Sequence, residues 1–167
     1  NDLASKNYLP PLDTKNMKLI IQLITWNGAK YIPLLFKSLR EQTFQDWFLF
    51  VWDNASADKT VELIKSELNT LGVQSQIVES KENLGFAGGH NAVFKYDCHS
   101  EHSEESTAAN YVLLLNQDMY LEPDCLAKLV DFMDANPEAA AVSPRLMKWD
   151  FANGAFTNMI DTLGLKI

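Results

Sequence analysis

The chain has 167 residues, of which 47% are hydrophobic and 22% are charged, and this is enough for one domain with a single core. Its 14 basic and 22 acidic residues give a net charge of -8, which argues against a nucleic-acid-binding surface because such a surface needs a basic patch. No signal peptide or membrane span is recognisable, and Cys98 and Cys125 lack metal-ligand spacing, so we expect free thiols and a cytoplasmic location.

Five short runs of apolar residues have the length and composition of buried strands. They cover residues 17–25, 47–52, 75–79, 110–115 and 139–143. Each is followed by turn-forming or polar residues, as expected where a strand enters a loop.

Amphipathic segments alternate with these runs, because apolar residues recur there at the spacing of a helix face. Helices are expected over residues 32–39 and 61–71, through 93–94, and over 123–133. Ser56 or Asp58 is expected to cap the second helix and Gly72 to end it. The alternation predicts an α/β fold, a three-layer α/β/α sandwich around a mostly parallel sheet.

Functional groups of such a fold lie where parallel strands end and loops begin, so the polar residues that end two runs should converge at one edge of the sheet. The second run ends on Asp53 and Asn54. The fourth ends on Asn116 and Asp118, which point to the same side of an extended backbone, with Gln117 pointing away. A carboxylate beside a second polar group suits Mg²⁺ or Mn²⁺, although a turn after a buried strand explains the same residues.

The segment 83–91 contains three glycines and leads into the third helix. Glycines at a helix entrance let the backbone approach a diphosphate, which the free N–H groups of the first turn favour. The segment does not follow the first strand, as a dinucleotide fingerprint would, so we reject a nicotinamide cofactor. A tight glycine-rich connection is the alternative, and His90 either touches the diphosphate or has a capping or packing role.

Four blocks of this sequence resemble, in order and in spacing, the successive signatures of family 2 glycosyltransferases, most closely those of the rhamnosyltransferase-like branch. The blocks lie at residues 24–28, 51–60, 82–91 and 113–118, within a resemblance that covers about Met17 to Leu146. The resemblance implies a GT-A (Rossmann-like) fold, a UDP- or dTDP-sugar donor, and a Mg²⁺ or Mn²⁺ ion held by Asp118. Asn116 replaces the first acid of the commonest Asp-x-Asp form, which makes it a hydrogen-bonding partner rather than a metal ligand.

The resemblance also assigns residues to the donor, with Thr25, Asn27 and Asp53 expected at its base and ribose. The full donor-binding set is Thr25, Trp26, Asn27, Asp53, Asn54, Asn83, Gly85, Gly88, Gly89, His90, Asn91 and Asn116.

The implied reaction is transfer of the sugar to a saccharide or lipid-linked acceptor in bacterial cell-surface polysaccharide synthesis, and peripheral membrane association of the parent enzyme is compatible with it. A donor-binding module without turnover is one alternative. A nucleotidyltransferase is a second, and we rank it last because residues 25–29 lack the glycine-rich basic phosphate loop that such an enzyme carries after its first strand.

An inverting transferase also needs a carboxylate base that deprotonates the acceptor hydroxyl. Asp150 and Asp161 are the only carboxylates after Pro144, and neither lies in a motif resembling the family's base. We therefore expect the base beyond Ile167, leave the catalytic residue unassigned, and expect this chain to be a truncated donor half that cannot transfer sugar.

Two segments are expected to lie outside the functional site. Residues 1–16 read as a flexible leader before a glycosyltransferase domain over residues 17–167. Residues 98–109 read as an exposed, charged loop, in which His99 and His102 are not expected to hold a metal.

Overall fold

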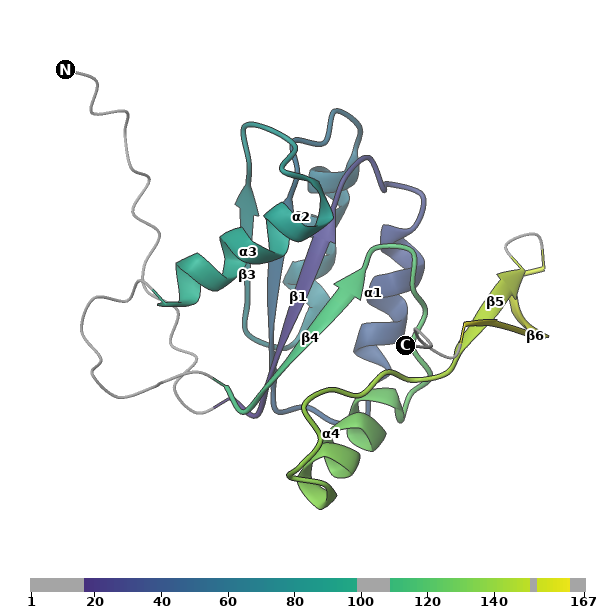
Figure 1. The fold of residues 1–167 in the computed structure, drawn as a ribbon. Helices are drawn as coiled ribbons and strands as arrows, with labels where there is room; N and C mark the ends of the chain where they lie inside the picture. The colour runs from purple at the N-terminus through teal and green to yellow at the C-terminus, as the bar shows by residue number, and fades with distance from the viewer. Residues whose placement is uncertain (1–16, 99–108, 151–152, 163–167) are drawn as a thin grey trace.

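The computed structural model describes residues 17–98, 109–150 and 153–162. Its main sheet has four strands in the spatial order β3-β2-β1-β4, all of them parallel to their neighbours (Figure 1). The strands are β1 (Leu19–Thr25), β2 (Trp47–Asp53), β3 (Ser75–Glu79) and β4 (Tyr111–Asn116).

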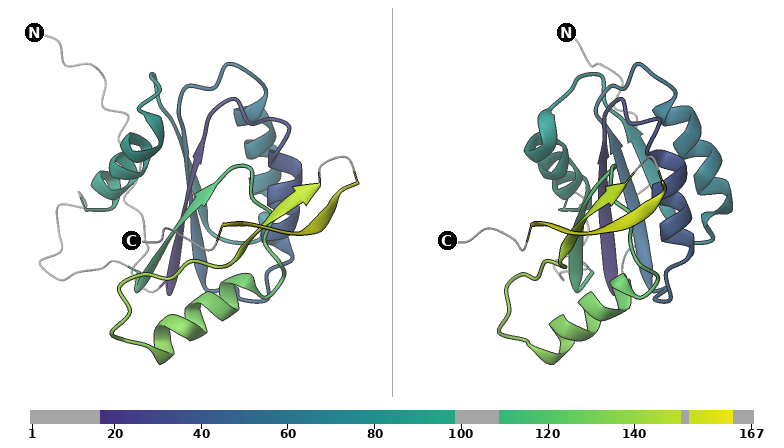
Figure 2. Two further views of the ribbon diagram at one scale, coloured as in Figure 1. Left: turned by 45° about the vertical axis from the view of Figure 1, so that its right-hand side comes forward. Right: turned by 90° about the vertical axis from the view of Figure 1, so that its right-hand side faces the viewer.

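Helices cover both faces of this sheet. They are α1 (Ile32–Arg40), α2 (Thr60–Leu71), α3 (Gly85–Cys98) and α4 (Cys125–Ala135). Viewed along the sheet, α1 and α2 lie on one side and α3 on the other (Figure 2). The expected three-layer α/β/α sandwich with a parallel sheet is therefore confirmed.

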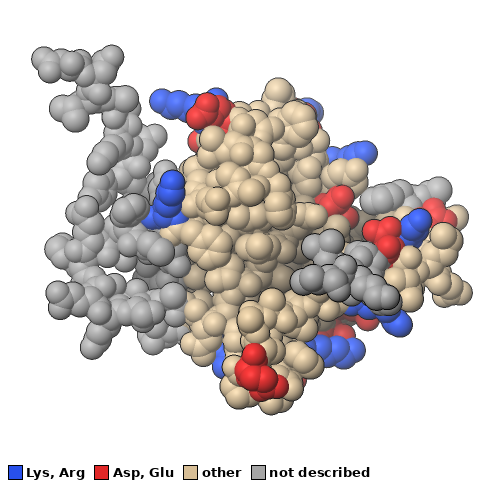
Figure 3. All heavy atoms as spheres, viewed as in Figure 1, with Lys and Arg blue, Asp and Glu red and all other residues tan. Residues whose placement is uncertain are grey.

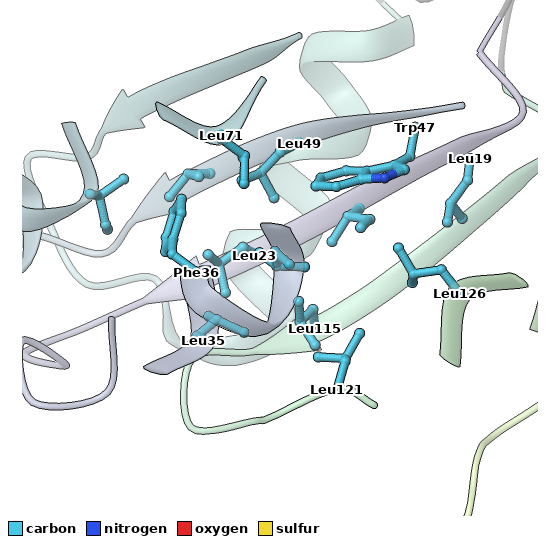
Figure 4. Packing of buried hydrophobic residues seen from close by; sticks show 14 of the residues in the cluster. Leu19, Leu23, Leu35, Phe36, Trp47, Leu49, Leu71, Leu115, Leu121 and Leu126 are labelled. Carbon is cyan, nitrogen blue, oxygen red and sulfur yellow. The ribbon is translucent and has the colours of Figure 1, made fainter. Parts of the chain in front are cut away.

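The core consists of two apolar layers that sandwich β1 and β2. Odd-numbered residues of β1, such as Ile21 and Leu23, pack with α1 and α2, and the even-numbered Ile20 and Ile24 pack on the α3 side. Figure 4 shows the first layer, in which leucines from the strands meet Phe36 of α1. Every residue of β1 and β2 is buried, which explains why both runs are largely apolar instead of alternating.

The second helix shows where the expected boundaries hold and where they do not. Gly72 ends α2 with a left-handed φ of 80°, as expected. The N-cap is Lys59 and not Ser56 or Asp58, so the expected caps are wrong. Ser56 instead accepts a hydrogen bond from the Asn27 N–H in the loop after β1. Asp58 lies one residue before the N-cap, and it accepts from the N–H of Thr60, the first residue of α2.

The expected strand over residues 139–143 is also wrong. The chain there is irregular and Val142 is exposed, because an apolar run forms a strand only where a neighbouring strand pairs with it. A separate antiparallel hairpin follows instead, formed by β5 (Leu146–Asp150) and β6 (Ala155–Thr162). The Asn153-Gly154 pair in its turn is a strong sequence signal for a hairpin, and a search for apolar runs alone misses it.

Aromatic contacts hold this hairpin against the rest of the chain. The Tyr120 ring stacks on Trp149 with centroids 4.8 Å apart, and Phe156 packs edge-on against both rings. The Tyr120 hydroxyl donates to Glu41 just after α1. The hairpin is thereby fixed beside the α1 layer, where it is drawn in yellow in Figure 1.

Several expectations concern residues outside the described ranges, namely the leader at 1–16, the histidines at 99 and 102, and the chain end at 163–167. Within the described ranges, no helix is both long and apolar enough to cross a bilayer.

Candidate functional site

The four parallel strands bring four loops to one edge of the sheet, the upper edge in Figure 1. Thr25 of β1 pairs with Asp53 of β2, and Ile24 of β1 pairs with Asn116 of β4. Asp118 follows two residues after Asn116. The expectation that Asp53, Asn116 and Asp118 share the carboxyl edge of one sheet is therefore confirmed.

At this edge, Asp53 and Asn116 lie on opposite faces of the sheet. Asp53 continues the alternation of Val51, which packs against α1 and α2, whereas Asn116 follows Leu115 and so belongs to the α3 side. Since β1 lies between them, their backbones are about 10 Å apart, twice the usual spacing of neighbouring strands. The site is thus a rim that spans β1, with an acid on one side and an amide on the other.

Asp53 organises the β2 side of this rim. Its Oδ1 accepts hydrogen bonds from the hydroxyls of Thr25 (2.8 Å) and Ser56 (2.6 Å), and its Oδ2 accepts from the Ser56 N–H (2.8 Å). Only 1% of Asp53 and 1% of Thr25 is exposed. The carboxylate therefore holds two loop starts in place, and its expected contact with the donor base or ribose stays a prediction.

The loop after β1 is held by side chains from the loops after β2 and β4 and from the first residue of α2. The backbone N–H groups of residues 26, 27, 28 and 29 donate at 3.0, 2.9, 2.8 and 3.2 Å to the side chains of Gln117, Ser56, Thr60 and Asp58, in that order. Burial opposes ionisation of Asp58, but the hydrogen bonds it accepts from Thr60 and Ala29 hold its pKa below the usual value. Asn27, with a left-handed φ of 45°, accepts from the Ala57 N–H, which fixes the turn.

Asn54 connects the end of β2 to the entrance of α3. Its Oδ1 accepts from the Trp52 indole N–H and the Leu84 N–H, and its Nδ2 donates to the Gly85 carbonyl. Gly85 has a φ of 71°, so it supplies the left-handed residue that starts the helix. The donor-binding role expected for Asn54 is thus joined by a structural one.

The three glycines of α3 differ in what surrounds them. A Cβ at Gly89 would lie 3.0 Å from a methyl carbon of Ile24, so this glycine lets the helix pack closely on β1. A Cβ at Gly88 would meet Leu84 at 2.8 Å, whereas Gly85 has open space around it. Of the three, Gly85 is the one at which the backbone is open to a ligand.

His90 is buried between α3 and β1. Its Nδ1 lies 3.0 Å from Oε1 of Gln22, and Phe86 packs edge-on against its ring. Because an amide oxygen only accepts, Nδ1 carries the proton, and Nε2 has no hydrogen-bond partner among the described residues. Burial lowers the pKa of His90, so the imidazole is neutral at pH 7.

Asn116 and Asp118 lie at the end of β4, and both are exposed. The strand ends at Asn116, and Gln117 and Asp118 form a turn. The argument from an extended backbone therefore does not apply to Asp118, and the expectation that both side chains point to one side stays a prediction. The Gln117 amide is bound to the backbone of Trp26 in the loop after β1.

A divalent ion would find one available carboxylate here. Asp118 is exposed, whereas Asp53 is enclosed by its hydrogen bonds. The described residues contain no group of three or more His, Cys, Asp or Glu side chains arranged for a metal. Mg²⁺ commonly binds through one or two carboxylates and completes its coordination with substrate phosphates and water. The residues thus fit an ion that arrives with a diphosphate.

The remaining expected site residues lie around the same rim and are exposed. Asn83 accepts from the Gly85 N–H at 2.8 Å, and Asn91 lies on the open side of α3. Trp26 and Phe86 expose 53% and 55% of their surfaces. In the view of Figure 3 the charged side chains lie mostly around the periphery, and the surface over α3 and β4 is largely uncharged. Few carboxylates therefore oppose an anionic ligand on this face.

Sequence reasoning missed several residues that build the site. It treats Gln117 only as pointing away and Ser56 only as a helix cap, although both bind the loop after β1. It also misses Gln22, yet a glutamine within an otherwise apolar buried strand is itself a signal for a buried polar partner. Thr60 gave no signal, because its partner, Gly28, lies 32 residues away in the chain.

Solved structures with similar folds include a mannosyltransferase and a protein solved with a nucleotide sugar. S. aureus TarS 1-349, solved with UDP-GlcNAc, aligns with a TM-score of 0.60 and 23% identity over 79% of this chain and 38% of that chain. The mannosyltransferase PcManGT from Pyrobaculum calidifontis, solved with GDP-Man and Mn²⁺, aligns with a TM-score of 0.60 and 20% identity over 84% of this chain and 36% of that chain. The present chain thus spans well under half the length of either protein.

The sequence itself matches the family described as Glycosyl transferase family 2 over residues 21–155. This match includes most of β1, all of β2 to β4, the loops at their carboxyl ends and the hairpin strand β5. Because it covers most of the chain, and because the parallel sheet agrees in fold with both similar structures, the chain belongs to the family 2 glycosyltransferases and has their GT-A fold.

Proposed function

We propose that these residues bind the donor of a glycosyltransferase that moves a sugar from a nucleoside diphosphate to a hydroxyl of a saccharide or lipid-linked acceptor. The observation that carries the proposal is the rim itself: an accessible Asp118 after β4 lies beside a braced loop after β1. Support comes from the nucleotide sugars in the similar structures, UDP-GlcNAc in one and GDP-Man with Mn²⁺ in the other.

Asp118 would hold the divalent ion on the donor diphosphate, with Asn116 as a hydrogen-bonding neighbour. When bound, Mg²⁺ or Mn²⁺ would offset the negative charge that develops on the departing diphosphate. The chain's own contribution is to present one carboxylate at the end of a rigid strand, with a turn that leaves it accessible. Because the chain carries a net charge of -8, a bound divalent ion would supply the local positive charge that an anionic donor needs.

The nucleoside would occupy the loops after β1 and β2. Thr25, Asn27 and Asp53 would meet the base and ribose, and the exposed indole of Trp26 offers an apolar surface for the base. Rigid loops lower the entropy lost on binding, and the four N–H groups at residues 26–29 are already bonded. A UDP- or dTDP-sugar is the donor that we propose.

The acceptor side follows from the chemistry of inversion. A carboxylate takes the proton of the acceptor hydroxyl while the hydroxyl oxygen attacks the anomeric carbon and the nucleoside diphosphate departs. We propose that this base lies outside the described residues and that the parent enzyme acts in surface-polysaccharide synthesis at the cytoplasmic face of the membrane. The proposed position of the base is tested by assaying sugar transfer by this chain and by its Asp150→Asn and Asp161→Asn variants. Transfer by this chain that is lost in either variant would place the base among the described residues and overturn the proposal that it lies outside them.

The test of donor binding is calorimetry with UDP, dTDP and GDP, each with Mn²⁺ and with EDTA. We expect Mn²⁺ to strengthen binding of the preferred diphosphate by about tenfold or more, and Asp118→Asn to remove that gain, because one carboxylate bridges the protein and the ion. Asp131→Asn, an exposed acid on α4, is the matched control and should keep the gain. Equal affinity with and without Mn²⁺ in the wild-type protein would refute the proposed metal-dependent binding.

A further inference from the structure

We propose that Gln117 is a positioning residue that fixes the distance between the two halves of the donor site. The inference rests on the proposed function. It concerns a side chain between Asn116 and Asp118 that would touch neither the ion nor the nucleotide, because its amide is occupied by the backbone of Trp26.

The contact between Gln117 and Trp26 is a pair of opposed hydrogen bonds. The Trp26 N–H donates to Oε1 at 3.0 Å, and Nε2 donates to the Trp26 carbonyl at 3.0 Å. A primary amide offers a donor and an acceptor side by side, which a carboxylate or a hydrocarbon side chain does not. Two bonds to one residue restrict both the position and the tilt of the loop after β1.

Gly28 shows that the loop and this side chain are fitted to each other. A Cβ at residue 28 would overlap Oε1 and Cδ of Gln117 and would lie 3.0 Å from its Nε2. The φ of Gly28 is not positive, so its backbone conformation does not require glycine. Glycine is required at this position because the Gln117 side chain lies so close to it.

Gln117 joins the loops after β1 and β4 beyond the last pair of their ladder, Ile24 with Asn116. Ser56, Thr60 and Asp58 tie residues 27–29 to the segment after β2, which leaves the nucleoside side braced without Gln117. The peptide bond to Asp118 ties Gln117 to the metal side. The amide therefore sets how far the Trp26 loop lies from the carboxylate that would hold the ion.

This geometry predicts that losing Gln117 affects the metal-dependent part of binding more than nucleoside binding. In Gln117→Ala we expect uridine affinity to change less than about threefold, and the Mn²⁺-dependent gain for UDP to fall about tenfold, because misplacement by about 1 Å can cost more than that. Gln117→Glu should also lack the Mn²⁺-dependent gain in UDP affinity. Its second carboxylate oxygen would face the Trp26 carbonyl and could not donate a hydrogen bond to it. If another diphosphate binds the wild-type protein better than UDP, it and its nucleoside replace UDP and uridine.

A double-mutant cycle with Gly28 tests the fit independently of the ligand. Gly28→Ala alone should lower the free energy of unfolding, because the new methyl group displaces Gln117. In Gly28→Ala/Gln117→Ala the methyl group has room, so the double variant should be less destabilised than the sum of the single variants. Additive losses would overturn the proposed fit.

The binding outcomes separate this inference from the function on which it rests. A wild-type protein without Mn²⁺-dependent diphosphate binding would refute the proposed function and, with it, the positioning role. A wild-type protein with such binding, and a Gln117→Ala variant that keeps the full gain, would overturn the inference alone. If Gln117→Ala lowers the affinity for uridine by the same factor as the metal-dependent gain, the inference is also overturned. Gln117 would then only stabilise the conformation of the loop after β1.

Discussion

His90 is a residue whose protonation state is coupled to the fold. It packs between α3 and β1 with one nitrogen bound to Gln22 and the other without a described partner. Burial lowers its pKa, so the folded protein resists a proton that the unfolded chain accepts near pH 6.5, as histidine usually does. The folded state is then favoured by a neutral imidazole, and this contribution is complete above that pH and lost as the pH falls below it.

Wild-type protein should therefore lose more stability between pH 7.5 and pH 5.5 than His90→Gln does. The variant removes the titrating group, whereas all other histidines and carboxylates are shared by both proteins and cancel in the comparison. Urea unfolding at the two pH values measures the difference. Equal losses in the two proteins would show that His90 titrates alike in the folded and unfolded states.

At the scale of single elements, glycines mark where the backbone must turn. Gly72 ends α2 in the left-handed conformation, exposed and with nothing within 4 Å of the position of a Cβ. The hairpin turn contains Gly154 with a φ of 61°. Both positions can be found from sequence, because left-handed backbone is cheap only for glycine. The sequence does not show, however, which strand the segment after such a turn pairs with.

Replacement of Gly72 isolates the strain of this helix end. Gly72→Ala should destabilise the protein by about 1 kcal/mol, because the methyl group meets no neighbour and the cost comes from the backbone conformation alone. Gly72→Asn should cost less, since asparagine tolerates this conformation. Chemical denaturation of the three proteins gives the order, and a variant with alanine as stable as the wild type would contradict the assigned strain.

For the whole molecule, stability is concentrated in the layer that joins the sheet to α1, α2 and α4. Leucines from β1, β2 and β4 meet there, as Figure 4 shows for Leu23, Leu49 and Leu115. The other face of β4 is different, because Val112 and Leu114 are 40% and 49% exposed. Neighbouring residues on one strand thus differ sharply in burial, which follows from the period of two along a strand.

Leu115→Ala should cost about 2 to 5 kcal/mol of unfolding free energy, because it opens a cavity in the buried layer. Leu114→Ala removes the same atoms from a half-exposed site and should cost less than about 1 kcal/mol. The two variants differ by one position on the same strand, so they control for local propensity. Similar losses would mean that β4 pairs in a register shifted by one residue, which exchanges its faces.

The sequence by itself determined the alternation of strands and helices, the parallel sheet and the edge at which its polar residues gather. These follow from local periodicity and from residues that end each run, so neighbours along the chain suffice to predict them. The helix end at Gly72 and the strand over residues 75–79 belong to the same class, and both are confirmed.

Only the tertiary structure decided which side chains meet. It separated Asp53 from Asn116 by a strand, buried His90 against Gln22, paired β5 with β6 instead of extending the sheet, and brought Gln117 to Trp26 from 91 residues away in the chain. Each of these contacts depends on strand order and on how closely segments distant in the chain approach. Local patterns fix the conformation of a segment but not its distant neighbour, because many pairings satisfy the same hydrophobic pattern until the whole core is packed.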